Sequence, residues 1–169
     1  YGVYDFSLST DLYEYSGKNH RWPEYYSQLV FSDDGTFQPL ADETSLRLLY
    51  REKQDRDILF SAVYNNSCPH REHFISLLRR RYGATNVETY GSVRIGRDCD
   101  KYEIIGRSRF HLAFENSTFP GYTTEKLFQC LQMGAYRLYW GPTSVETEFD
   151  TQYYTNIEHY HSADDLFEL

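Results

Sequence analysis

One arrangement constrains the fold of this chain most: an apolar run, a polar loop and a helical pattern that follow one another twice. The first copy combines the apolar run 58–63 with a helical pattern over 69–82, and the second combines 110–114 with 123–133. Runs this short and apolar are typical of strands buried on both faces of a parallel sheet. Strands alternating with helices predict an α/β fold in which right-handed crossovers connect the strands.

Residues at the helix ends support this interpretation. Pro69 suits the first turn of a helix, with Ser67 or Cys68 in the cap region. The second helical pattern, 123–133, opens on threonine and is followed by Gly134, and a left-handed glycine commonly closes a helix. The helical patterns therefore have start and stop signals at their expected ends.

The other segments are consistent with one domain. Residues 136–140 form a third expected strand, and Ser162 is a suitable N-cap for a last helix. Residues 1–50 have an extended start and then a polar stretch punctuated by Gly and Pro, which is typical of a peripheral segment. We therefore expect 1–50 to be an inter-domain or linking segment and 51–169 to be the α/β domain, incomplete at both ends.

Composition narrows the class of ligand. The formal net charge is −8, which argues against a protein that depends on neutralising nucleic-acid phosphates. A small anion still fits, because a few placed cations and a helix N-terminus can hold it. No run approaches the roughly 20 consecutive apolar residues that cross a bilayer, so we expect no membrane contact from this segment. The three cysteines lack the spacing of metal ligands, so we expect no metal site.

Ligands of parallel α/β sheets bind beyond the carboxyl ends of the strands, which directs attention to the loops 64–70 and 115–124. Arg71 follows the first loop, in the first turn of a helix whose free N–H groups and dipole favour an anion. Its guanidinium could form a bidentate pair of hydrogen bonds with a phosphate. The alternative is a surface arginine that pairs with a local carboxylate such as Glu72.

The second loop and the start of its helix carry the densest set of possible ligand groups. Asn116 and Glu125 can bond ribose hydroxyls, Lys126 can reach a phosphate, and Tyr122 offers a flat face or a hydroxyl. In the alternative interpretation, Asn116 is a turn residue, Glu125 complements the helix dipole and Lys126 is solvated. Composition favours neither interpretation.

These motifs together resemble a known family. The segment FENSTFPGYTTEKL (114–127) closely resembles the signature of the α1,3/α1,4-fucosyltransferases, glycosyltransferase family 10. The stretches Ser67–Arg71, Tyr90–Gly91 and Tyr139–Val145 resemble further family segments, in the family's order. Arg21-Trp22-Pro23 resembles the R-x-P motif of the stretch that joins the family's two domains, although this match and the one at Tyr90–Gly91 are weak alone.

The resemblance implies the Rossmann-like C-terminal half of a GT-B glycosyltransferase, a parallel sheet flanked by helices that binds GDP-fucose as donor substrate. Arg71 and Lys126 would contact the diphosphate. The nucleoside and fucose would be contacted by Asn116, Tyr122 and Glu125. Glu115 is the other acid of the motif, and the resemblance fixes its role less firmly.

The family inverts configuration at the fucose anomeric carbon and requires no metal or other cofactor. Its catalytic base belongs to an N-terminal acceptor-binding domain, which would precede Tyr1 or lie on another chain, so no acid here is assigned as base. The expected reaction is transfer of fucose to a GlcNAc or Glc unit of an oligosaccharide or glycoprotein in α1,3 or α1,4 linkage.

The alternatives are a non-catalytic nucleotide-sugar binding module and a structural domain with fortuitous matches. The resemblance implies a type II membrane protein of the Golgi lumen in a eukaryote, and a cytoplasmic or membrane-peripheral protein in a bacterium.

Overall fold

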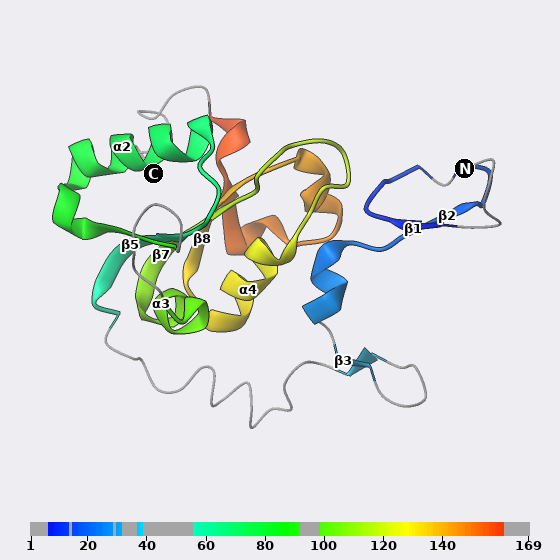
Figure 1. Ribbon diagram of the computed structural model, residues 1–169, viewed down its shortest axis with the longest axis horizontal. Helices are drawn as coiled ribbons and strands as arrows, with labels where there is room; N and C mark the ends of the chain where they lie inside the picture. Colours follow the sequence, from blue (N-terminus) through cyan, green and yellow to red (C-terminus); the bar gives the residue numbers. More distant parts are fainter. Residues whose placement is uncertain are drawn as a thin grey trace.

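A parallel sheet forms the centre of the molecule (Figure 1). The computed structural model describes residues 7–13, 15–28, 30–31, 37–38, 56–91 and 99–160. The sheet has five strands, all parallel, in the order β6 (Val87–Tyr90), β5 (Ile58–Val63), β7 (Ser108–Phe114), β8 (Tyr136–Trp140) and β9 (Tyr154–Asn156). The predicted α/β class with a parallel sheet is confirmed.

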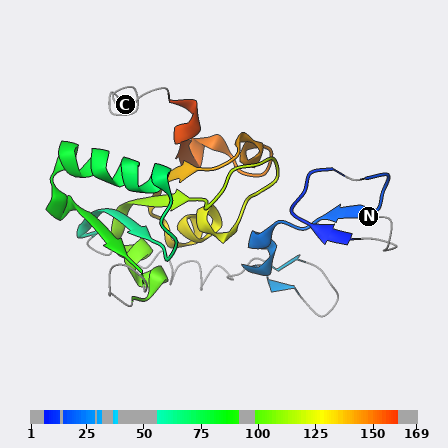
Figure 2. The same ribbon diagram turned by 45° about the horizontal axis from the view of Figure 1, so that its top comes forward.

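Within the described residues, the α-helices that cover the two faces of the sheet are α2 (Pro69–Tyr82), α3 (Lys101–Arg107) and α4 (Glu125–Met133). Figures 1 and 2 show α2 on one face and both α3 and α4 on the other. Successive side chains of a strand point to opposite faces of the sheet, so each strand contributes to the hydrophobic core on both faces. In β7, Leu112 and Phe114 pack with α2, whereas Ala113 packs with α3 and α4. The central strands are therefore buried on both faces, as their apolar runs predict.

The described part of the N-terminal segment contacts α4 through one 3-10 helix. It contains the parallel pair β1 (Ser7–Ser9) and β2 (Asn19–Arg21), the 3-10 helix η1 (Glu24–Gln28), and the antiparallel pair β3 (Val30–Phe31) and β4 (Phe37–Gln38). Tyr25 of η1 stacks on Phe128 of α4, with ring centroids 5.9 Å apart, and contacts Phe149 at 5.1 Å. The segment is thus attached to the α/β domain through aromatic contacts, and its role as a linking segment stays a prediction.

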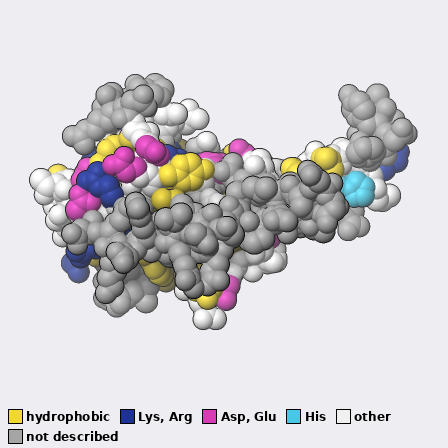
Figure 3. Space-filling view, turned by 90° about the horizontal axis from the view of Figure 1, so that it is seen from below, with side chains coloured by type: hydrophobic (Ala, Val, Ile, Leu, Met, Phe, Trp, Pro, Cys, Tyr) yellow, Lys and Arg dark blue, Asp and Glu magenta, His cyan; other side chains and the backbone are white. Residues whose placement is uncertain are grey.

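Short 3-10 helices complete the described chain: η2 (Ala84–Asn86), η3 (Thr143–Thr147), η4 (Thr151–Tyr153) and η5 (Ile157–His159). Within the described residues, no helix has the length and apolar character needed to cross a membrane. Figure 3 shows Lys and Arg side chains lying among Asp and Glu side chains on the described part of one face. The described part of that face therefore carries charges of both signs.

Most predicted boundaries hold with small shifts. α4 begins at Glu125 rather than 123, with Thr124 as N-cap, and closes at Gly134 in the left-handed conformation with φ of 73°. The expected helix beyond Ser162 and the expected extended start before Ser7 lie outside the described residues. α3 and β9 were not predicted.

Candidate functional site

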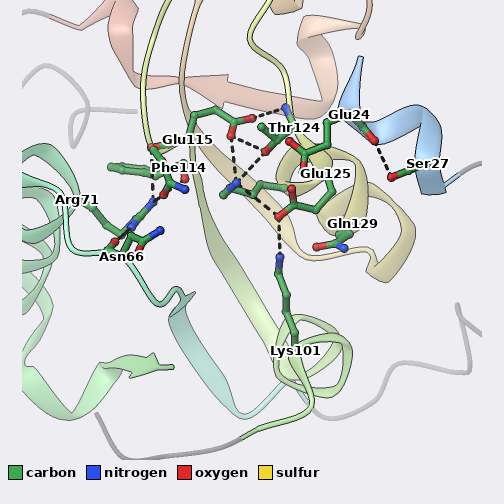
Figure 4. Close-up of polar contacts among 12 residues, drawn as sticks. Glu24, Ser27, Asn66, Arg71, Lys101, Phe114, Glu115, Thr124, Glu125 and Gln129 are labelled. Atoms are coloured by element: carbon green, nitrogen blue, oxygen red, sulfur yellow. Dashed lines mark hydrogen bonds and ion pairs between the residues drawn. The ribbon is translucent and has the colours of Figure 1, made fainter. Parts of the chain in front are cut away.

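The strand-to-helix loops after β5 and β7 meet at the carboxyl edge of the sheet because these two strands are neighbours. Arg71 of α2 joins the loops (Figure 4). Its Nη1 donates to the carbonyl of Asn66 at 2.6 Å, and its Nη2 donates to the carbonyl of Phe114 at 2.8 Å and to Oδ1 of Asn116 at 3.2 Å. The guanidinium lies 4.6 Å from the centroid of the Tyr64 ring. The sequence-predicted residues Arg71 and Asn116 are thus in direct contact.

The environment of Arg71 differs from that of the surface arginine in the alternative interpretation. Its residue exposure is 1%, so it is not a surface arginine, and Glu72 accepts a hydrogen bond from Ser67 at 2.9 Å. The guanidinium lies beneath the two loops and donates to their oxygens, which fixes the shape of the loops. Its contact with a diphosphate stays a prediction. Sequence reasoning missed this burial because it depends on the β7 loop folding over the start of α2.

A second group of polar residues forms at the start of α4. Glu115 directly follows β7 and is fully buried; its carboxylate accepts from the Thr124 N–H at 2.8 Å and from the Thr124 hydroxyl at 2.5 Å. Nζ of Lys126 lies 3.2 Å from Glu115 Oε2 and 3.5 Å from Glu125 Oε1. Lys101, the first residue of α3, reaches the same Glu125 oxygen at 3.2 Å (Figure 4). We call Lys101, Glu115, Glu125 and Lys126 the charge cluster.

Burial and neighbouring side chains set the pKa values of Glu115, Glu125 and Lys126. Burial raises the pKa of the Glu115 carboxyl, against the opposing effect of Lys126. Burial alone would lower the pKa of Lys126, but Glu115 and Glu125 outweigh it and hold that pKa above its ordinary value. Burial would raise the pKa of Glu125, yet Lys126 and Lys101 keep it lowered. Lys126 and Glu125 are therefore charged at neutral pH, and Lys126 is not the solvated surface residue of the alternative interpretation.

The turn before α4 presents Tyr122. Its ring packs at 4.6 Å from that of Phe119, and burial raises the pKa of its hydroxyl. The preceding Gly121 has φ of 89°, and its N–H donates to the Ser144 hydroxyl at 2.9 Å. Its carbonyl accepts from Arg21 Nη1 at 3.0 Å. The turn is therefore held from two sides, by η3 and by the N-terminal segment.

Arg21 of the N-terminal segment contacts the α/β domain at two places, Gly121 and Glu148. Its guanidinium forms an ion pair with Glu148, in which Nε donates to Oε1 at 2.8 Å. The Tyr25 hydroxyl donates to the other Glu148 oxygen at 3.0 Å. Arg21 thus connects the N-terminal segment, the Gly121 turn and the end of η3.

A pocket of about 490 Å³ opens beside the loop that follows β7, at the carboxyl edge of the sheet. It is lined by the β7 loop, the residues after β8 and one residue of η5: Thr118, Phe119, Pro120, Gly141, Pro142, Thr143, Ser144 and Glu158. Among the described residues, no grouping of three His, Cys, Asp or Glu side chains suits a metal ion.

Sequence reasoning missed Lys101 as a member of the site. A signal for its helix existed, because Asp100 is followed three residues later by Glu103. The Asp100 carboxylate indeed caps α3 by accepting from the N–H groups of Tyr102 and Glu103, at 2.9 and 3.3 Å. The contact of Lys101 with Glu125 joins two separate helices, which no local pattern reveals.

Comparison with known proteins decides the family. Residues 51–169 match the family model described as glycosyltransferase family 10 (fucosyltransferase) C-term. The chain belongs to this family. The matched region includes the charge cluster and Tyr122.

Individual relatives are longer than this chain. An α-(1,3)-fucosyltransferase FucT of Helicobacter pylori is 25% identical over 99% of this chain, which spans 40% of that protein. A GDP-fucose protein O-fucosyltransferase 3 of Danio rerio is 40% identical over 120 residues, which are 63% of this chain and 26% of that protein. This family 10 chain therefore spans less than half of either curated relative.

Solved structures share the fold. The crystal structure of an α1,3-fucosyltransferase with GDP-fucose matches with a TM-score of 0.77 and 22% identity, over 98% of this chain and 56% of that one. The structure titled as the enzyme with GDP matches with a TM-score of 0.75 and 21% identity over the same shares. The family 10 chain thus has the fold of the fucosyltransferases, as its sequence predicted.

Proposed function

We propose that this chain binds GDP-fucose and supplies the donor-binding half of an inverting fucosyltransferase. The observation that supports it best is the position of Lys126, a charged lysine at the carboxyl edge of a parallel sheet, inside the family's Tyr-x-x-Glu-Lys motif. Ligands of such sheets bind at this edge. The two solved fucosyltransferases with GDP and GDP-fucose, which share the fold, support the same donor.

In this proposal, Lys126 and Arg71 act on the diphosphate in different ways. Lys126 contacts it directly, since its side chain is 18% exposed and charged. Arg71 lies at the start of α2 beneath the loops, so it adds positive potential there and reaches the phosphate after a rearrangement of its carbonyl partners. Charge accumulates on the departing GDP as the glycosidic bond breaks, and these cations stabilise it.

The other motif residues recognise the rest of the donor. We propose that Asn116, Tyr122 and Glu125 bond the nucleoside and the fucose, since each lies on the loop or first turn next to Lys126. Glu115 is fully buried and supports the site from below by binding Thr124 and Lys126. No metal is needed in this scheme, because the diphosphate is neutralised by side chains.

The acceptor half completes the reaction. A sugar hydroxyl is a poor nucleophile and needs a carboxylate that takes its proton while it is held in line with the donor. We propose that an acceptor-binding domain, upstream or on another chain, supplies that base. The proposed acceptor is a GlcNAc or Glc unit of a glycan, linked α1,3 or α1,4. For a eukaryotic source we propose the Golgi lumen, and for a bacterial source the cytoplasm or the membrane periphery.

Titration calorimetry tests donor binding directly. The folded chain should bind GDP and GDP-fucose in preference to UDP, and Lys126→Ala should weaken binding by about 1.5–3 kcal/mol, as for a hydrogen bond to a charged group. Lys18→Ala, at an exposed lysine of the N-terminal segment, is the matched control. Equal affinity for UDP, or no GDP binding by a folded sample, would contradict the proposal.

A protein acceptor is a second candidate, and one observation favours it. Identity to the Danio rerio GDP-fucose protein O-fucosyltransferase 3 is 40%, against 25% to the Helicobacter pylori enzyme. The chain together with the proposed acceptor-binding domain should be offered both GlcNAc-terminated glycans and folded protein domains with exposed Ser or Thr, with GDP release as readout. GDP binding with neither transfer nor hydrolysis would favour the non-catalytic binding module instead.

A further inference from the structure

Lys101 enters the charge cluster from a different helix than the motif residues. It is the first residue of α3, and its Nζ lies 3.2 Å from Glu125 Oε1 (Figure 4). The same oxygen lies 3.5 Å from Nζ of Lys126. Glu125 is thus held between two ammonium groups, one from its own helix and one from α3.

The position of Lys101 is fixed by the packing of α3 against α4. Gln129 of α4 donates to the Tyr102 hydroxyl at 3.2 Å, and Ile105 of α3 is buried in one cluster with Leu127 and Cys130 of α4. The side chain of Lys101 is 27% exposed, so water screens its charge only in part. Lys101 therefore has a defined location relative to Glu125.

Charge balance shows what Lys101 contributes. With it, the Glu125 carboxylate has two ammonium partners, Lys101 and Lys126. Without it, Glu125 would pair with Lys126 alone. A diphosphate approaching Lys126 would then compete with a carboxylate that has no other cation among these contacts.

We propose that Lys101 is a positioning residue for the donor: it holds the Glu125 carboxylate and leaves the Lys126 ammonium available to the diphosphate of a nucleotide. The inference rests on the proposed function, in which Lys126 contacts that diphosphate. Lys101 itself acts through Glu125 and makes no contact with the donor.

A double-mutant cycle separates positioning from direct contact. Lys101→Met should weaken GDP binding by about three- to tenfold, the range of a partly buried ion pair, whereas Lys101→Arg should retain most of the affinity. In a Glu125→Gln background, the further change Lys101→Met should have little effect, because the carboxylate it positions is gone. Lys18→Met controls for the loss of one positive charge from an exposed site.

A readout that a purely structural role would leave unchanged is the titration of Glu125. The charged groups near this carboxyl are Lys101 of α3, Lys126 of α4 and, through Lys126, Glu115 directly after β7, with the Tyr122 hydroxyl also nearby. Carboxyl ¹³C shifts should show a higher Glu125 pKa in Lys101→Met and not in Lys101→Arg.

The outcomes are distinct. A parent chain that binds GDP and a Lys101→Met variant with unchanged affinity would overturn this inference alone. A loss that persists in the Glu125→Gln background would show direct contact and also overturn it. If the folded parent chain binds no GDP, the proposed function fails and the inference fails with it.

Discussion

The Arg21 guanidinium donates a hydrogen bond of 3.0 Å to the carbonyl of Gly121, the residue before Tyr122. Arg21 precedes the region 51–169 that matches the family model, whereas Gly121 lies in the family's signature loop. The same guanidinium pairs with Glu148 at the end of η3. The geometry of the proposed donor loop thus depends in part on a segment of chain that the sequence placed at the periphery.

Replacing Arg21 should therefore affect both stability and nucleotide binding. Arg21→Met leaves the half-buried Glu148 without its cation, which should lower the free energy of unfolding by about 1–3 kcal/mol. The freed Gly121 turn should also weaken GDP binding. Chemical denaturation and calorimetry measure the two effects, with the exposed Lys18→Met as control; intact GDP affinity in a folded Arg21→Met sample would show that the turn holds its shape without Arg21.

A side chain at position 121 should lower the free energy of unfolding. Its φ of 89° is in the left-handed region, and an added Cβ would meet the carbonyl of Thr10 and the guanidinium of Arg21. Gly83 is a matched control because its φ of 92° is similar, while the nearest atom to an added Cβ is 3.8 Å away. Gly83→Ala should cost only backbone strain, about 1–3 kcal/mol, and Gly121→Ala should cost more. Equal losses in denaturant unfolding would show that the turn can move away from Thr10.

A buried histidine should make the fold sensitive to acid. His111 of β7 lies opposite Ser61 of β5, and its Nδ1 is 2.6 Å from the Ser61 hydroxyl, which is itself 2.6 Å from that of Ser108. Burial lowers the pKa of His111 from 6.5 to about 3. The folded state therefore keeps His111 neutral at pH values where the unfolded state protonates it.

The difference in proton binding at His111 between the unfolded and folded states determines whether acid raises or lowers stability. Between pH 6.5 and about 3 the unfolded chain binds more protons at His111, so stability should fall with falling pH by up to about 1.4 kcal/mol per unit from this group. His111→Asn removes that contribution, so its stability deficit relative to the parent should shrink as the pH falls from 7 to 4. The measurement is urea unfolding across this range, with the exposed His73→Asn as control for loss of a histidine elsewhere. A deficit that is constant with pH would contradict the assignment.

The sequence predicted the elements whose signals are local. The apolar runs of β5 and β7 and the left-handed glycine that ends α4 are each explained by residues close in the chain, and all three predictions are confirmed. The resemblance also led to the first turn of α4, which contains Lys126. The family assignment and the parallel sheet therefore follow from the order of residues alone.

The rest depends on contacts between distant residues. Arg71 is buried because the loop after β7 folds over it, and Arg21 meets Glu148, 127 positions away. The edge strand β9 has three residues, too few for a clear alternation of apolar and polar side chains. Lys101 shows both cases, since its capped helix had a local signal and its contact with Glu125 had none.

The cap of α3 allows a final test of how that helix serves the charge cluster. Asp100 accepts hydrogen bonds from two N–H groups of α3, and Asp100→Ala should cost about 0.5–2 kcal/mol of stability. Because Lys101 is the next residue, fraying of this end should also release Glu125 and weaken GDP binding.

Asp150 caps η4 by accepting from the N–H of Gln152 at 2.9 Å, so Asp150→Ala provides a cap loss outside the cluster. Asp150→Ala should reduce stability alone. Similar GDP affinities of the two variants, at matched stability, would show that the donor site does not depend on the α3 cap.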